Sequence, residues 1–219
     1  MSLWNQILKL IHKELLVEWR QRYAINGLFL YGICMVFMIA LQIRDSIQPA
    51  TWNLISWLMI VFISINANAK SFLSEPVEQQ LYWYGLVSPV AVIVAKMIYN
   101  AALLGLLSFL TIFLFWGLSG PEIEQGSWFW LAIIGGSCCI AICTTLLSAI
   151  ASKATRQGTL LAVLSFPILL PILVNNISLT RKSIEGMAFW HISEIQIIIG
   201  ITGVFATLSV LLFPLLWID

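Results

Sequence analysis

Apolar residues occur in long runs that are separated by shorter polar segments. A helix needs about 20 apolar residues to cross the hydrocarbon core of a bilayer. Six runs are of this kind, and they cover residues 24–43, 52–69, 90–118, 128–151, 158–178 and 195–217. The pattern predicts an all-α integral membrane protein with one membrane domain and six transmembrane helices. Because six is an even number, we expect both termini on the same side of the membrane.

The composition supports a membrane protein and excludes several other classes. Of 219 residues, 60% are hydrophobic and 10% are charged, against about 25% charged residues in a typical soluble domain. The polar segments are too short for a separate catalytic domain. The net charge of +1 gives no indication of nucleic-acid binding. We expect no cleavable signal peptide, because more than 20 residues of mixed character precede the first run.

The basic residues predict the orientation of the chain. If the N-terminus is cytoplasmic, the inner segments carry Lys9, Lys13, Arg20, Arg22, Lys70, Lys153 and Arg156, with Lys96 near the inner interface. The outer segments then carry only Arg44, Arg181 and Lys182. Cytoplasmic loops of membrane proteins are enriched in Lys and Arg. We therefore predict that both termini are cytoplasmic, together with residues 70–89 and the basic turn at 152–157.

The segment before the first run has the spacing of an amphipathic helix. Its apolar positions form one stripe, which consists of Trp4, Ile7, Leu8, Ile11, Leu15 and Trp19. Its charged candidates are Lys9, Lys13, Glu14, Glu18, Arg20 and Arg22. This pattern predicts an interfacial helix with the apolar stripe in the membrane boundary. Glu18 lies within that stripe and Glu14 at its edge, so either another segment covers them or Glu18 pairs with Arg22 one turn later.

A second polar segment, SEPVEQQLYWYGLVSP at 74–89, lies between the second and third runs. Ser74 is a suitable N-cap, and Gly85 is suited to ending a helix. The segment therefore predicts a short cytoplasmic helix over 75–84. Its candidate contact residues are Glu75, Pro76, Glu78, Gln79, Tyr82, Trp83 and Tyr84. It is either an interfacial segment that closes a loop or a docking helix for a cytoplasmic partner.

Polar residues also occur inside the third and fifth runs. Lys96 and Asn100 share a helix face near the inner interface. Lys96 either reaches the lipid phosphates or contacts a neighbouring cytoplasmic helix. In the fifth run, Pro167 and Pro171 each remove a backbone donor and predict a bent helix. Asn175 and Asn176, which follow them, either satisfy the freed backbone groups or line a cavity.

The chain lacks the sequence motifs of the common enzymes. It has no GxxxxGK[ST], HExxH or GxSxG motif, and we expect no catalytic residues and no metal site. We favour ordinary packing over a soft-metal site for Cys138, Cys139 and Cys143. His191 follows Phe189 and Trp190 in an outer segment. It is either a haem ligand or part of an interfacial segment.

Four stretches together resemble one known family. They are KELLVEWRQR at 13–22, LVSP at 86–89 with the following Ala95 and Lys96, ATRQGTLLAVLSFP at 154–167, and PILLP at 167–171. Their order over most of the chain resembles the haem exporter protein B (CcmB) family of cytochrome c maturation. The chain departs from that pattern in YWYGL at 82–86 and in the polar NANAK at 66–70.

The resemblance implies the permease subunit of an ATP-binding-cassette transporter with the six-helix ABC-2 export-type fold. The ATPase would be a separate cytoplasmic chain, and 75–84 would be the coupling helix that seats in it, with 9–22 beside it. The family implies a bacterial inner membrane, a haem-handling membrane protein and a haem chaperone as partners, and haem as a transported or handled ligand. No cofactor would be bound directly, ATP would act through the partner subunit, and we expect a homodimer. Two alternatives remain open: a haem-binding protein that uses His191, and an ABC-2 permease for a drug or polysaccharide.

Overall fold

The computed structural model of the chain describes residues 3–20, 22–42, 47–73, 87–152, 157–187 and 192–218. This part contains seven helices and no strand: α1 (Leu3–Arg20), α2 (Arg22–Gln42), α3 (Pro49–Leu73), α5 (Pro89–Ser119), α6 (Gly126–Ala151), α7 (Gln157–Ile184) and α8 (Ile192–Ile218). The prediction of an all-α membrane protein is confirmed.

Five helices are long and apolar enough to cross a membrane, and they make the protein multi-pass. These spans are Pro49–Ala67, Pro89–Ser119, Gly126–Ala151, Val163–Ile184 and Ser193–Leu215. The first predicted span, 24–43, lies in α2, whose apolar part Asn26–Gln42 is shorter. The described residues therefore support five of the six predicted spans. The first predicted span, 24–43, stays a prediction.

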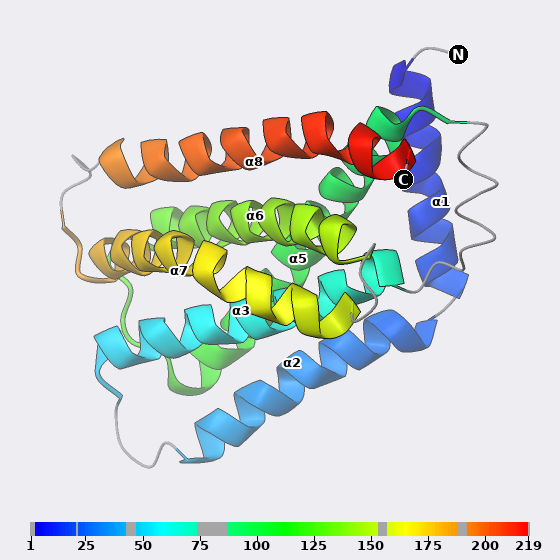
Figure 1. Cartoon of the computed structure of the whole chain (residues 1–219). Coiled ribbons are helices and arrows are strands. Elements are labelled where there is room, and N and C mark those ends of the chain that lie inside the picture. Colours follow the sequence, from blue (N-terminus) through cyan, green and yellow to red (C-terminus); the bar gives the residue numbers. More distant parts are fainter. Residues whose placement is uncertain are drawn as a thin grey trace.

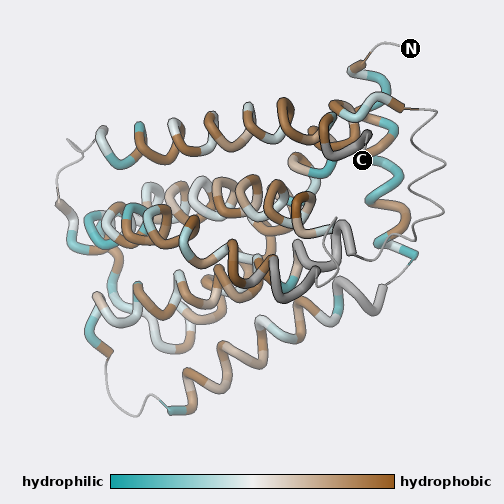
Figure 2. Tube along the Cα trace, in the orientation of Figure 1, coloured by the Kyte–Doolittle hydropathy of each residue, from teal (hydrophilic) through white to brown (hydrophobic). Residues whose placement is uncertain are grey.

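α3, α6, α7 and α8 run side by side, and α1 lies across one end of these helices (Figure 1). Both termini lie near α1, at the same end of the bundle (Figure 1). Among the five spans, α6 is the most buried and α8 the least. The bundle is mainly apolar, whereas polar and apolar residues alternate along α1 (Figure 2). This arrangement puts the N-terminal helix against the ends of the spans.

Large apolar and aromatic side chains fill the centre of the bundle, where α3, α5, α6 and α7 meet. The rings of Trp52 and Phe115 stack with centroids 5.2 Å apart. Gly136 lets α6 approach its neighbours closely, since a Cβ atom there would lie 2.4 Å from the Trp57 ring and 2.8 Å from Asn176. The helix packing at this point depends on the absence of a side chain.

The fifth predicted span continues further than the apolar run suggests. α7 ends at Ile184, so residues 179–184, which the sequence assigns to a connecting segment, are helical. Arg181 bonds Glu185 (Nε to Oε1, 2.7 Å), and basic residues near a helix C-terminus are favourable. Gly186 then ends the helix with φ of +65°, and the Met187 N–H donates to the carbonyl of Lys182 at 3.1 Å.

α7 contains both Pro167 and Pro171 and changes direction along its length (Figure 1). The two asparagines that follow do not bond the backbone groups that the prolines free. Asn175 Nδ2 donates to the carbonyl of Glu194 at the start of α8, at 3.0 Å. Asn176 is fully buried, and neither of its amide atoms has a hydrogen-bond partner. Of the two alternatives for this pair, the structure does not show the first, in which the asparagines bond the freed carbonyls.

Candidate functional site

Three of the predicted polar residues, Glu14, Glu18 and Lys96, come together where α1 meets α5. Ile7 and Leu10 of α1 are buried against Ala91 and Ala95 of α5. The small side chains of the two alanines let the helices approach closely. The contact joins the N-terminal helix directly to the first turns of a membrane-spanning helix.

Ser88 ties the start of α5 to α1. Its side-chain oxygen accepts a hydrogen bond from the Ala91 N–H at 3.3 Å, which makes it the N-cap of α5, and Pro89 follows in the first turn. The same hydroxyl donates to Oε1 of Gln6 in α1 at 3.2 Å. The helix cap and the contact between helices therefore share one side chain.

Lys96 and Glu14 form an ion pair across this contact. Lys96 Nζ lies 3.5 Å from Glu14 Oε1, and the two side chains are 3% and 16% exposed. Lys13 is more exposed than either member of the pair, and its Nζ lies 3.4 Å from the same Glu14 oxygen. A buried ammonium group needs a partner of opposite charge, because its desolvation is unfavourable. Glu14 supplies that partner to Lys96.

A second carboxylate contact lies one turn further along. The Tyr99 hydroxyl donates to the Glu18 carboxylate, and Tyr99 is buried. Gln6, Glu14 and Glu18 thus meet Ser88, Lys96 and Tyr99 in the same order along both helices. At this contact α1 and α5 therefore run in the same direction.

These contacts bear on two questions that the sequence left open, although pairing of Glu18 with Arg22 stays a prediction because the Arg22 side chain lies outside the described ones. Glu14 and Glu18 are covered by another segment, and that segment is α5. Lys96 contacts the neighbouring helix, and its burial rules out a side chain that reaches the lipid phosphates. The assignment of Ile7 to the lipid-facing stripe is wrong, because Ile7 lies on the side of α1 that packs against α5.

Most of the remaining predicted apolar stripe is exposed, whereas Ile11 is half-buried and packs against the cluster of Ile7 and Leu10. Trp4 is 64% exposed and Trp19 is 71% exposed, and Leu8 and Leu15 are also exposed. Lys9 and Arg20 are exposed as well. α1 therefore has one side that packs on α5 and another that is available to lipid or to a partner.

Asn100 lies one turn after Lys96 but contacts a different helix. Its Nδ2 donates to Thr145 Oγ1 of α6 at 2.9 Å, and both residues are buried. The sequence placed Lys96 and Asn100 on one face without naming their partners. It missed Tyr99 and Gln6, although Tyr99 lies three residues after Lys96 and so shares its face.

Several predicted site residues lie outside the described residues or side chains. They are the coupling-helix candidates Glu75, Pro76, Glu78, Gln79, Tyr82, Trp83 and Tyr84, the basic turn residues Lys153 and Arg156, the Arg22 side chain, and His191. Cys139 and Cys143 are buried in the core, and Cys138 Sγ lies 3.7 Å from the carbonyl of Ala101. Within the described ranges, no group of three or more His, Cys, Asp or Glu side chains could hold a metal.

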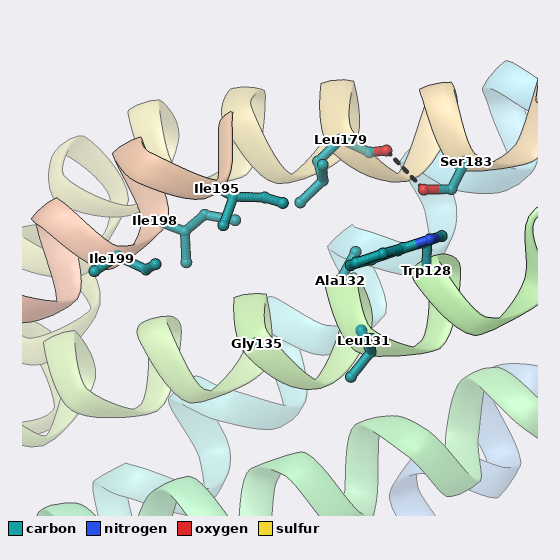
Figure 3. Close-up of a pocket in the computed structure, with 9 residues that line it drawn as sticks. All are labelled: Trp128, Leu131, Ala132, Gly135, Leu179, Ser183, Ile195, Ile198 and Ile199. Carbon is teal, nitrogen blue, oxygen red and sulfur yellow. Dashed lines mark hydrogen bonds between the residues drawn. The ribbon is translucent and has the colours of Figure 1, made fainter. Parts of the chain in front are cut away.

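A separate apolar pocket lies between α6, α7 and α8 (Figure 3). Its volume is about 200 Å³, and its lining residues are Trp128, Leu131, Ala132, Gly135, Leu179, Ser183, Ile195, Ile198 and Ile199. The Ser183 hydroxyl donates to the carbonyl of Leu179 at 3.2 Å (Figure 3). None of the predicted site residues is among these lining residues.

A family comparison gives the context of this arrangement. The sequence model described as CcmB protein matches residues 5–215, which is nearly the whole chain. A comparison with curated proteins finds no match. The matched range includes α1, the α1–α5 contact and nearly all of the last helix. The chain therefore belongs to the CcmB family, whose members are membrane permease subunits for haem in cytochrome c maturation and work with an ATPase in an ABC transporter.

Proposed function

We propose that this chain is the permease subunit that converts ATP hydrolysis by a separate ATPase chain into haem delivery, with release of the haem-loaded chaperone. In this proposal the chain has six spans and the ABC-2 fold, and it lies in the bacterial inner membrane with both termini in the cytoplasm. A haem-handling membrane protein and a haem chaperone are its further partners. It acts as a homodimer, binds no cofactor directly, uses ATP through its partner subunit, and handles haem as cargo.

The observation that carries the proposal is the ion pair between Glu14 and Lys96. It attaches α1 to the first turns of α5, and α5 begins at Pro89, shortly after the predicted coupling helix 75–84 in the chain. A displacement of that segment would act on α5 and α1 together. The chain has no phosphate-binding loop of its own, so the energy for such a displacement would come from a partner chain.

The exposed side of α1 suits a position at the membrane boundary. Trp4 and Trp19 expose large amphipathic rings, and Lys9 and Arg20 are exposed as well. Helices of this composition lie in the plane of the interface. In the proposed orientation, α1 therefore lies along the cytoplasmic surface of the membrane, next to the segment that receives the ATPase.

The test is a pull-down of the tagged chain in mild detergent, followed by identification and quantification of its partners. The double variant Trp83→Ala/Tyr84→Ala should reduce the co-purified ATPase by roughly tenfold, as expected when the anchoring aromatics of an interface are lost. Trp128→Ala is the control, because Trp128 lies in the pocket between α6, α7 and α8. It should leave the amount of ATPase unchanged.

Two results would contradict the proposal. One is an absence of any ATPase chain from the wild-type pull-down. The other is a normal amount of co-purified ATPase with the double variant, provided that this variant accumulates in the membrane like the wild type. This second result would show that 75–84 is not the docking surface for the ATPase.

A further inference from the structure

Polar side chains, most of them buried, form pairwise contacts from α1 to α5, from α5 to α6 and from α6 to α3. We call this set of side chains the polar ladder; its members are Glu14, Glu18, Lys96, Tyr99, Asn100, Thr145, Thr144 and Ser64. Its first contacts are those of α1 with α5, through Glu14 and Lys96 and through Glu18 and Tyr99. Asn100 then bonds Thr145 of α6 at 2.9 Å. The Thr144 and Ser64 hydroxyls, 3.1 Å apart, connect α6 to α3.

The inner members of the ladder are fully shielded. Ser64, Thr144 and Thr145 have no exposed surface, and Asn100 is 4% exposed. The threonine hydroxyls also bond their own helix, since Thr144 donates to the carbonyl of Ile140 at 2.7 Å and Thr145 to that of Ala141 at 2.6 Å. Each threonine is therefore held in one rotamer. In a dry environment, a broken bond between helices cannot be replaced by a bond to water.

The polar ladder connects the two helices that flank the predicted coupling helix. Ser64 belongs to α3, which ends at Leu73, and Asn100 belongs to α5, which begins at Pro89. The predicted coupling segment joins these two helices. The ladder connects the same two helices through α6, so only a displacement that moves α3 and α5 relative to each other would break its bonds, whereas a joint displacement would preserve them.

We propose that the polar ladder makes the neighbouring parts of α1, α3, α5 and α6 move as one unit when the ATPase acts. Asn100, Thr145, Thr144 and Ser64 are then positioning residues for energy coupling: they contact neither ATP nor haem. This inference rests on the proposed function, because it assumes that a separate ATPase drives the chain.

A second buried polar group provides the comparison that the test needs. Trp57 Nε1 donates to Thr180 Oγ1 at 2.9 Å, and Thr180 Oγ1 donates to Asn53 Oδ1 at 2.7 Å. This group also joins two helices, α3 and α7, and is also buried. It lies near the start of α3, whereas Ser64 lies three turns later in the same helix. A loss of packing alone would affect both groups similarly.

The experiment compares Thr145→Val with Thr180→Val in the complete transporter. Both variants replace a buried hydroxyl by a methyl group. Three quantities are measured: the ATPase that co-purifies, the rate of ATP hydrolysis, and the yield of haem-containing cytochrome c per ATP hydrolysed. Thr145→Val should retain normal ATPase binding and hydrolysis but lower the yield per ATP, on the order of fivefold. Thr180→Val should leave that ratio unchanged.

The exchanged pair Asn100→Thr/Thr145→Asn should restore the ratio, because it restores a bond between α5 and α6 with the partners reversed. If Thr145→Val does not accumulate in the membrane, the smaller change Ser64→Ala decides the question with the same expected loss. An unchanged ratio in the ladder variants, or an equal loss in Thr180→Val, would overturn the inference. A wild-type protein that binds no ATPase would instead refute the proposed function.

Discussion

Lys96 of a membrane-spanning helix is buried against Glu14 of the N-terminal helix, with 3.5 Å between Nζ and Oε1. The two residues are 82 positions apart in the sequence. Lys96 is destabilised at this place without a carboxylate nearby, because a buried charge without a counter-charge is strongly unfavourable. The pair therefore fixes the position of α1 on α5. Because the two side chains differ in exposure, we expect substitutions of Glu14 and of Lys96 to differ in their effect on stability.

Glu14→Gln should destabilise the protein more than Lys96→Met does. The first variant leaves the ammonium of Lys96, which is 3% exposed, without its carboxylate; the second leaves Glu14, which is 16% exposed and still has Lys13 nearby. We expect a loss of about 3 kcal/mol for Glu14→Gln and a smaller loss for Lys96→Met. Unfolding of the purified variants in one detergent measures both. Equal losses would contradict the asymmetry.

Asn176→Leu should stabilise the protein. Both amide atoms of Asn176 are buried without a partner, and an unsatisfied buried polar group destabilises a fold by about 1–3 kcal/mol. Leucine has the same number and branching of side-chain heavy atoms and no polar atoms. The matched control is Asn53→Leu, which should destabilise because Asn53 bonds Thr180 and the carbonyl of Ile177. The midpoint of thermal unfolding measures both effects; a lower midpoint for Asn176→Leu would mean that its amide is satisfied.

Gly136→Ala and Gly135→Ala should differ sharply, although the two glycines are adjacent. A Cβ at position 136 would lie 2.4 Å from the Trp57 ring, whereas one at position 135 meets nothing within 4 Å. Overpacking of this kind destabilises by about 1–3 kcal/mol. We expect reduced accumulation and a lower unfolding midpoint for Gly136→Ala only. Similar behaviour of the two variants would contradict the close packing of α6 on α3.

Gly186→Ala should weaken the end of α7 for two separable reasons. The φ of +65° disfavours any residue with a Cβ, and that Cβ would lie 2.8 Å from the Cδ atom of the Glu124 carboxylate. Removing the carboxylate in Glu124→Ala/Gly186→Ala should recover the steric part of the loss and leave the backbone part, about 1 kcal/mol. Unfolding midpoints of the two single variants and the double variant separate these contributions. Full recovery in the double variant would show that the backbone is not strained.

The sequence predicted the helices well because the length of an apolar run is a direct physical requirement for crossing a bilayer. It placed the end of the fifth helix too early, since Thr180, Arg181 and Lys182 are polar and were assigned to a connecting segment. Polar residues are compatible with a helix that continues beyond the apolar core. Composition alone therefore marks the apolar part of a helix and not its hydrogen-bonded end.

The candidate site was predicted only in part. Glu14, Glu18, Lys96 and Asn100 were all identified, because charged or amide side chains in apolar surroundings need partners. Their partners could not be identified, since a helical pattern shows which residues share a face but not which helix covers it. The apolar stripe of α1 was interpreted as a single lipid-facing surface, whereas Ile7 packs on α5 and Trp4 is exposed. Tertiary packing determines that division.

The double role of Ser88 has a consequence for motion at this end of the molecule. Helix ends normally fray, because their first N–H groups have no partner within the helix. Here the hydroxyl that caps α5 also holds Gln6 of α1. Unwinding of the first turn of α5 would therefore also break the bond to Gln6 of α1. Melting of one helix end and loosening of another helix near Gln6 are thus coupled, and the coupling can be detected as faster amide hydrogen exchange at Ala91 together with that of the residues around Gln6.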